Sequence, residues 1–383
     1  MTETTSGPLS GVRVIELAGI GPGPYAAMLL ADLGAEVVRV ERPGPGASEV
    51  PPELDVLRRN RRSIVIDLRQ PEGQQTVLAM VAKADVLLEG FRPGVTERLG
   101  LGPDDCLAVN PRIVYGRMTG WGQTGPLAQA AGHDINYIAL TGALGAIGRA
   151  GDAPIPPVNL VGDFGGGSTF LVIGVLAALF EATRSGHGQV VDAAIVDGAS
   201  SLTALLHGLL AAGRWIDRRG ENFLDTGVPW YDNYATSDGE WMSVGPLEPK
   251  FYAEFTTLLG LDPEIAALRA TQAAWPQLRA AITEAFAGRT RQEWAEVFEG
   301  TDACVAPVLS LTEASQHPHL AARDTFIDVG GVRQPAPAPR FSRSVPGIPS
   351  APPAVGADGR QVLSDWGIHD AEALIAAGVV VCD

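Results

Sequence analysis

The chain contains 383 residues, which is enough for two domains that each bury a hydrophobic core. Hydrophobic residues make up 46% of the chain and charged residues 19%, a composition that is too apolar for a disordered protein. The formal net charge of −16 argues against a nucleic-acid partner and against adhesion to an anionic membrane.

Cysteine content and the shortness of the apolar runs predict a cytoplasmic protein. Cys106, Cys304 and Cys382 are too few and too scattered for a disulfide framework. The first residues, MTETTSGPLSG, carry no Lys or Arg and so do not resemble a signal peptide. The longest apolar run, FLVIGVLAALF, is much shorter than the roughly 20 residues that cross a bilayer. We therefore expect a soluble protein without a membrane span.

Alternating strand and helix patterns predict an α/β fold. Residues 11–17, 24–33 and 36–41 read as strand, helix and strand, which favours a parallel sheet with a right-handed crossover. Further strands are predicted at 63–68, 85–89, 112–118 and 188–196, and helices at 72–84, 133–142 and 197–212. We expect these elements to form a large Rossmann-like domain made of residues 1–212 and 325–383.

A smaller α+β domain is predicted at 229–324, including its return linker, after a polar linker at 213–228. Its expected elements are a β-hairpin at 234–244 around Asp238-Gly239 and helices at 249–259, 275–287 and 290–299. The CVAP sequence at 304–307 is expected to begin the return to the large domain. Residues 333–356 are rich in proline and predict an extended surface strap, followed by one or two short C-terminal helices.

The loop after the first strand matches a dinucleotide-binding pattern but lacks its chemistry. Residues 21–26 fit G-x-G-x-x-A, and Glu41 ends the next strand near the position expected for a ribose-binding acid. However, Pro22 and Pro24 have no N–H groups to offer a pyrophosphate. Arg42 would also bring a cation to the ribose position. These features disfavour a nicotinamide or flavin dinucleotide.

Arginines are concentrated around the predicted strands of this acidic chain. The run LRRNRR at 57–62 is either a solvated basic face or a phosphate-binding patch, because Arg offers paired donors to phosphate oxygens. Four more arginines follow strand ends or lie in the helices beyond them. They are Arg42, Arg69, Arg92 and Arg98. Ligands of open α/β sheets bind at the carboxyl ends of strands, so we expect a ligand with several phosphates there.

The stretch from Ala131 to Phe170 holds the strongest candidates for catalysis. Asp163 is followed by Gly165, Gly166 and Gly167 and then by an apolar helical run, which predicts a glycine-rich loop at a helix N-terminus. Asp163 would then be either a helix cap or a catalytic group. His133 and Asp134 are predicted to open a helix after a strand-end loop, where binding groups gather.

The sequence resembles the class III CoA-transferase superfamily, and within it the racemase branch that acts on alpha-methylacyl-CoA thioesters. The matching stretches include GVRVIELAGIGPGPYAAMLLADLGAEVVRVERPG, ADVLLEGFRPGVTERLGLG, MTGWGQTGP, AGHDINY, NLVGDFGGGS, GQVVDAAIVDG and GPLEPKFY. The resemblance runs from about residue 8 to 345. It implies an acyl-CoA ligand and an interlocked homodimer whose active site is shared between the two chains.

The resemblance also implies roles for individual residues. In racemases the residues matching His133 and Asp163 form an acid/base pair, and the residue matching Glu248 pairs with the histidine. The start of the helix at His133 and Asp134 would stabilise the enolate oxygen. No metal or separate cofactor is implied, since CoA is part of the substrate. The implied CoA-binding set is Arg42, Ile66, Arg69, Leu88, Arg92 and Arg98.

Three alternatives to a racemase are open at this stage. A class III CoA-transferase would use Asp163 as a nucleophile and would require a carboxylate acceptor. A dinucleotide-dependent dehydrogenase is disfavoured by the paired prolines. An acyl-CoA-binding protein without catalysis would tolerate loss of His133. The sequence does not distinguish among acyl chains.

Overall fold

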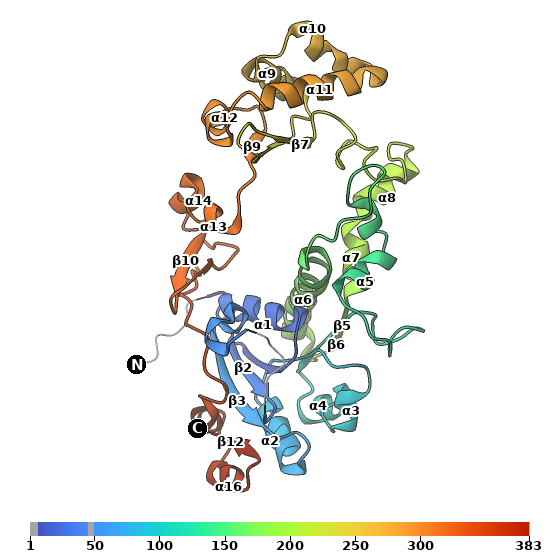
Figure 1. Ribbon diagram of the computed structural model, residues 1–383. Coiled ribbons are helices and arrows are strands. Elements are labelled where there is room, and N and C mark those ends of the chain that lie inside the picture. The colour runs from blue at the N-terminus through green and yellow to red at the C-terminus, as the bar shows by residue number, and fades with distance from the viewer. Residues whose placement is uncertain (1–6, 45–49, 383) are drawn as a thin grey trace. The chain divides into compact units, whose positions relative to one another are not determined.

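Short β-branched segments form a seven-stranded sheet with the order β12-β3-β2-β1-β4-β5-β6 (Figure 1). Strands β1 to β6 run parallel, and β12 pairs antiparallel with β3 at one edge. The strands are β1 Arg13–Leu17, β2 Glu36–Glu41, β3 Arg61–Ile66, β4 Val86–Glu89, β5 Val114–Thr119, β6 Val190–Ala194 and β12 Val380–Val381. The order reverses between β1 and β4, which is where open α/β sheets bind their ligands.

The computed structural model describes residues 7–44 and 50–382, which divide into two units. The first unit contains the large sheet and comprises Met1–Thr141, Val158–Leu202 and Ala322–Asp383. The second comprises Gly142–Pro157 and Thr203–Ala321. The second unit therefore takes residues 203–228, which the sequence assigned to the end of the large domain and to a linker, and it also takes 142–157.

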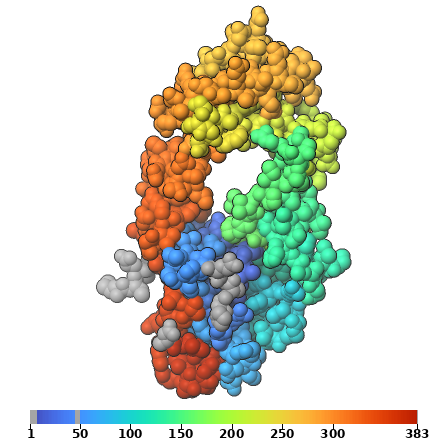
Figure 2. All heavy atoms as spheres, in the orientation of Figure 1, coloured from blue at the N-terminus to red at the C-terminus, as the bar shows by residue number. Residues whose placement is uncertain are grey.

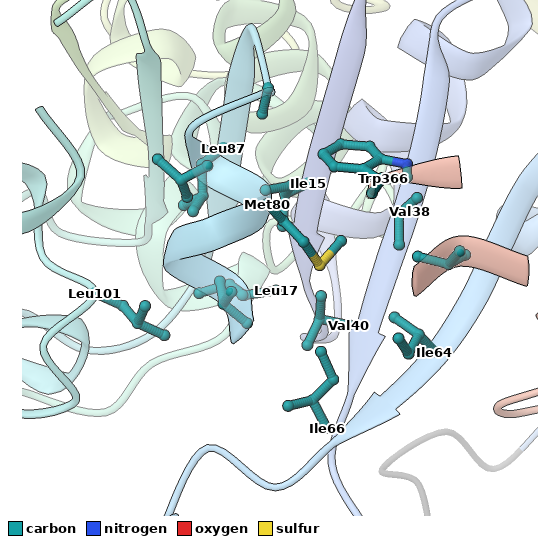
Figure 3. Close-up of a cluster of buried hydrophobic side chains, with 14 of the residues drawn as sticks. Ile15, Leu17, Val38, Val40, Ile64, Ile66, Met80, Leu87, Leu101 and Trp366 are labelled. Carbon is teal, nitrogen blue, oxygen red and sulfur yellow. The ribbon is translucent and has the colours of Figure 1, made fainter. Parts of the chain in front are cut away.

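Helices cover both faces of the large sheet because alternate strand residues are apolar on both sides. Val38 and Val40 of β2 pack in a core cluster with Met80 of α2 and Trp366 (Figure 3), whereas Val37 packs in the opposite cluster with α1 and α6. The helices of this unit are α1 Pro22–Asp32, α2 Pro71–Val81, α3 Val95–Arg98, α4 Pro103–Val109, α5 Asp134–Leu140, α6 Thr169–Ser185, α7 Ile195–Leu202, α15 Gly359–Asp365 and α16 Ala371–Ala376.

The C-terminal segment completes the first core. Trp366 is fully buried, and its indole N–H donates to Glu36 Oε1 at 2.9 Å. Figure 2 shows the last residues, in red, lying against the N-terminal part of the chain, in blue. A short hairpin, β10 Phe326–Val329 and β11 Val332–Pro335, precedes this segment where the sequence predicted only an extended strap from residue 333.

The second unit is built on a three-stranded antiparallel sheet and an aromatic core. Its hairpin turns at Asp238-Gly239 as predicted, between β7 Asp232–Ala235 and β8 Trp241–Val244. The third strand, β9 Val305–Pro307, pairs with β8, so the expectation that CVAP begins the return linker is wrong. The helices are α8 Ala204–Ala211, α9 Pro249–Leu259, α10 Pro263–Ala266, α11 Trp275–Phe286, α12 Arg291–Phe298, α13 Leu311–Ala314 and α14 Pro318–Ala322.

By length and composition alone, the helical stretch Leu160–Ser185 could cross a membrane. Within the first unit, its α6 portion packs against β5, β6 and α1. Val172 and Val175 of α6 are buried in the sheet core. The apolar character of this stretch is therefore explained by its packing as a core helix of the first unit.

The arginine run at 57–62 does not form a phosphate-binding patch, because its members are paired with carboxylates. Arg58 donates to Glu41 at 2.5 Å, and Arg59 donates to Asp32 at 2.5 Å. Arg61 donates to Glu16 of β1, which also accepts from Arg39 of β2. Arg58, Arg59 and Arg61 are buried, so the solvated-face alternative is also wrong for these three.

The cluster of Glu16, Arg39 and Arg61 fixes the loop between β1 and α1. Arg39 donates through Nη2 to the carbonyl of Gly19 at 3.1 Å, and Arg61 donates to the carbonyl of Pro24. Burial by itself would raise the pKa of Glu16, but the charges of Arg39 and Arg61 outweigh it and hold that pKa below its usual value. Glu16 therefore stays ionised at neutral pH.

We predict that Glu16→Gln lowers the free energy of unfolding by about 3 kcal/mol or more, because it leaves two buried guanidinium groups without their shared carboxylate. Glu372→Gln is the matched control, since Glu372 pairs with Arg360 at an exposed position and should cost less than about 1 kcal/mol. Urea unfolding followed by circular dichroism measures both. Equal losses of unfolding free energy in the two variants would contradict the assignment of Glu16 as the shared carboxylate of two buried guanidinium groups.

Candidate active site

Asp163 lies inside a helical segment and not in a loop as the glycines suggested. Leu160–Ser168 is a π-helix that continues directly into α6. Neither this segment nor α6 has a side-chain N-cap hydrogen bond, so the cap role considered for Asp163 is not observed. π-helical turns frequently occur at functional sites, which favours the catalytic alternative.

The carboxylate of Asp134 holds the backbone at Asp163. The N–H of Asp163 donates to Asp134 Oδ1 at 2.6 Å. This approach requires glycine at position 162, because a Cβ there would lie 2.2 Å from the same oxygen. Among the described residues, Asp134 Oδ2 is buried and has no hydrogen-bond partner. A carboxylate is thus kept beside Asp163 without a neutralising cation in contact.

The glycines after Asp163 serve close packing. Helix α7 crosses the π-helix with its Gly198 against the backbone of Gly166, where a Cβ on either residue would overlap the other chain segment. At the end of the π-helix, Ser168 Oγ donates to the carbonyl of Pro22 at 2.7 Å, which ties the segment to the start of α1. The segment is therefore fixed on two sides.

These surroundings raise the pKa of Asp163 to about 6. Burial is the largest cause, because it disfavours the charged form. The negative charge of Asp134 acts in the same direction, whereas His133 lowers the pKa of Asp163. A carboxyl group with a pKa near neutrality can both accept and return a proton at physiological pH.

His133 lies at the N-terminus of α5, where its backbone N–H donates to Asn136 Oδ1 at 3.0 Å. Its side chain is exposed in the first unit. Asp134, the next residue, accepts from the Asp163 N–H at 2.6 Å, so the start of α5 lies beside the segment that carries Asp163. The start of α5 thus places His133 and Asp134, while Asp163 comes from the π-helix.

The site lies at the switch point of the large sheet. The loop after β1 reaches it through Gly21, where a Cβ would lie 3.5 Å from Asp163 Oδ2. Tyr25 of α1 stacks on Phe164, with 4.3 Å between the ring centroids. Since β1 and β4 flank the point of reversal, the G-x-G-x-x-A loop contributes a wall of this site and not a dinucleotide-binding turn.

Tyr137 belongs to the same site and was not singled out from the sequence. Burial and the charge of Asp163 raise its pKa, whereas Arg92 lowers it. Its hydroxyl donates to the carbonyl of Gly132 at 2.5 Å. The available signal was its place in the GHDINY motif that also holds His133 and Asp134, since Tyr137 lies on α5, which begins directly after His133.

The predicted CoA-binding residues divide into two groups. Arg42, Arg69, Arg92 and Arg98 are exposed, and Arg69 pairs with Asp67 at 2.8 Å. Ile66 and Leu88 are only 0% and 2% exposed, and their side chains pack in the two core clusters. These two side chains are therefore not available to a ligand in this structure.

A cavity of about 460 Å³ lies beside Arg42 in the first unit. Arg42, Pro43 and Gly44 follow β2, and Val65 belongs to β3. Pro52 and Glu53 also line the cavity, and the C-terminal segment contributes Ala354, Val355 and Val381. Its volume is within the range of small-molecule sites.

Glu248 precedes α9 as its N-terminal flanking residue in the second unit. Its pairing with His133 stays a prediction. Across residues 7–44 and 50–382, no group of three or more His, Cys, Asp and Glu side chains is placed to hold a metal ion.

The large parallel sheet with helices on both faces defines a mixed α/β protein. The chain belongs to CoA-transferase family III, whose model matches residues 9–359. Alpha-methylacyl-CoA racemase of Mus musculus is 46% identical over 96% of this chain and 95% of its own length. The Homo sapiens protein of that name is 42% identical over 95% and 94%. A crystal structure of a CAIB/BAIF family protein from Brucella suis superposes with a TM-score of 0.80 at 29% identity, covering 94% of this chain and 99% of that one.

We predict that Gly162→Ala lowers the free energy of unfolding by about 2 kcal/mol, because the added methyl group forces α5 away from the π-helix. Gly23→Ala is the control, since a Cβ on this helical glycine would meet nothing within 4 Å. Thermal unfolding compares the two variants. A Gly162→Ala protein as stable as Gly23→Ala would show that the close approach is not required.

Proposed function

We propose that this chain interconverts (2R)- and (2S)-2-methylacyl-CoA thioesters by removing the C2 proton and returning it through an enolate. The observation that carries the proposal is the 2.6 Å hydrogen bond from the Asp163 N–H to Asp134, the residue after His133, which brings the start of α5 beside Asp163. The pKa of Asp163, raised to about 6, fits an acid/base role. The relatives from mouse and human, similar over nearly their whole lengths, support the same reaction. The enzyme would be an isomerase that needs no cofactor besides the CoA of its substrate.

Inversion at C2 requires one proton acceptor on each side of the carbon. The Asp163 carboxylate takes the proton from one face, and the protonated imidazole of His133 delivers another to the opposite face. The reverse reaction exchanges the two roles. The N–H groups at the start of α5 stabilise the enolate oxygen that exists between the two transfers. In this scheme Glu248 orients the imidazole and stabilises its charged form.

The CoA part of the substrate is held at the carboxyl ends of the strands. The exposed arginines Arg42, Arg69, Arg92 and Arg98 supply positive charge for its phosphates. Ile66 and Leu88 lie in the buried strands β3 and β4, and in this proposal they support the site from the core without touching CoA. Binding of the CoA part in this way fixes the position of the thioester, so that C2 lies between the two acid/base groups.

A second copy of the chain completes the enzyme in this proposal. Large apolar side chains are exposed on α5, the π-helix, α6 and α7, which pack against one another in the first unit. They include Ile135, Leu140, Leu160, Ile173, Phe180 and Leu202. An interlocked homodimer would cover them and bring Glu248 of one chain to the active site of the other.

A cytoplasmic location is also part of the proposal. Cys106, Cys304 and Cys382 are all free thiols, which fits a reducing compartment. The substrate proposed here is a water-soluble thioester, and the reaction consumes no lipid-bound partner.

Incubating the purified enzyme with one enantiomer of a 2-methylacyl-CoA in D₂O tests the reaction. We predict deuterium at C2 and formation of both enantiomers, because each turnover exchanges the C2 proton with solvent. His133→Ala and Asp163→Ala should each lower the rate of inversion by at least about 100-fold. A wild-type enzyme that neither labels nor inverts the substrate would refute the proposal.

The family alternative is a CoA-transferase with Asp163 as nucleophile. Such an enzyme would form an acyl-enzyme that hydroxylamine traps, and it would pass CoA to a carboxylate acceptor. Trapping at Asp163 without C2 exchange would favour the transferase.

The pH dependence of kcat/KM tests the role of Asp163. Its carboxyl must be ionised to accept a proton, so the acid limb should rise through about pH 6. Asp134→Asn removes the neighbouring negative charge but keeps an oxygen for the Asp163 N–H, so we predict that this limb moves to lower pH. An acid limb that stays in place or moves to higher pH would contradict the assigned cause.

A further inference from the structure

Tyr137 occupies a slot that is shaped around its ring. A Cβ on Gly120, just after β5, would lie 2.0 Å from Tyr137 Cζ, and a Cβ on Gly132 would lie 2.7 Å from Tyr137 Cε1. Trp121 packs edge-on against the same ring, with 4.8 Å between the ring centroids. Gly120, Gly132 and Trp121 therefore restrict the Tyr137 ring to one position.

The hydroxyl of Tyr137 is committed to the backbone of the residue before His133. It donates to the carbonyl of Gly132, which is five residues earlier in the chain. The N–H of His133 is held by Asn136 Oδ1 from the same helix. The peptide that joins Gly132 to His133 is thus fixed at its carbonyl oxygen by Tyr137 and at its nitrogen by Asn136.

This peptide decides where the imidazole points. His133 has extended backbone geometry, with φ −130° and ψ 173°, while the next residue begins α5. The side chain of His133 is exposed in the first unit, so the side chain itself has little packing to hold it there. Rotation of the Gly132–His133 peptide would move the imidazole away from its place opposite Asp163. The fixed peptide is then the principal restraint within this unit.

We propose that Tyr137 is a positioning residue that holds His133 opposite Asp163 by fixing the Gly132–His133 peptide. The inference rests on the proposed racemase reaction, since it concerns the placement of one of its two acid/base groups. Asp163 has a restraint of its own in the packing of α7 on the π-helix, in addition to its hydrogen bond to Asp134. Loss of the Tyr137 hydroxyl should therefore weaken only the His133 half of the pair.

The test is Tyr137→Phe, which keeps the ring in its slot and removes only the hydroxyl. In D₂O, the enantiomer whose C2 hydrogen faces Asp163 should still lose that hydrogen and regain deuterium on the same face. Inversion, which needs His133, should slow by roughly 10-fold. The ratio of exchange to inversion should thus rise for this enantiomer, while the other enantiomer loses exchange and inversion together.

Tyr115→Phe is the matched control. The Tyr115 hydroxyl also donates to a backbone carbonyl in the first unit, that of Leu101 at 2.8 Å, but it lies in the core cluster with α2. Both variants lose one hydrogen bond, and only Tyr137→Phe should change the ratio of exchange to inversion. Thermal unfolding checks that both variants fold.

Other outcomes overturn the inference. If Tyr137→Phe slows exchange equally for both enantiomers, the hydroxyl acts on the enolate and not on His133. If it lowers stability and leaves the ratio unchanged, its role is structural. Failure of the wild-type enzyme to exchange either enantiomer would instead refute the proposed function, so the two failures are distinguishable.

Discussion

The hydrogen bond from the Asp163 N–H to the Asp134 carboxylate is the interaction on which the site depends. It joins α5, which begins beside His133, to the π-helix that carries Asp163, and it does so over a distance that only glycine at position 162 permits. Burial is the main reason that the pKa of Asp163 is raised, and the negative charge that this contact brings beside it acts in the same direction. The contact with Asp134 thus affects both the position of Asp163 and its proton affinity.

A buried cluster of charged side chains holds one wall of this site in place. The cluster of Glu16 in β1 with Arg39 and Arg61 from β2 and β3 ties two carbonyls to the sheet, that of Gly19 in the loop after β1 and that of Pro24 at the start of α1. That loop forms a wall of the site through Gly21. Buried charge clusters add little net stability compared with apolar packing, and their partners cannot be removed singly. Their benefit here is a loop held in one position beside the acid/base pair.

The sequence predicted the parallel sheet well, because its strands are short apolar segments separated by helical patterns. His133 and Asp163 stood out because both lie in distinctive motifs, and their action as an acid/base pair stays a prediction. It misassigned the arginine run because the carboxylates that neutralise it, such as Glu16, are far away in the chain and meet it only through strand register. The π-helix was missed because glycines in a row favour a loop locally, whereas contact with α7 requires them in a helix.

The central claim is that an imidazole and a carboxyl group face opposite sides of one acidic carbon. A crystal structure of the enzyme with a 2-methylalkyl thioether analogue of the substrate, which has no acidic hydrogen, measures this most directly. The account predicts that the carbon corresponding to C2 lies between His133 and Asp163, within about 3.5 Å of an acid/base atom on each face. A carbon that contacts only one of them, or both from the same face, would contradict it.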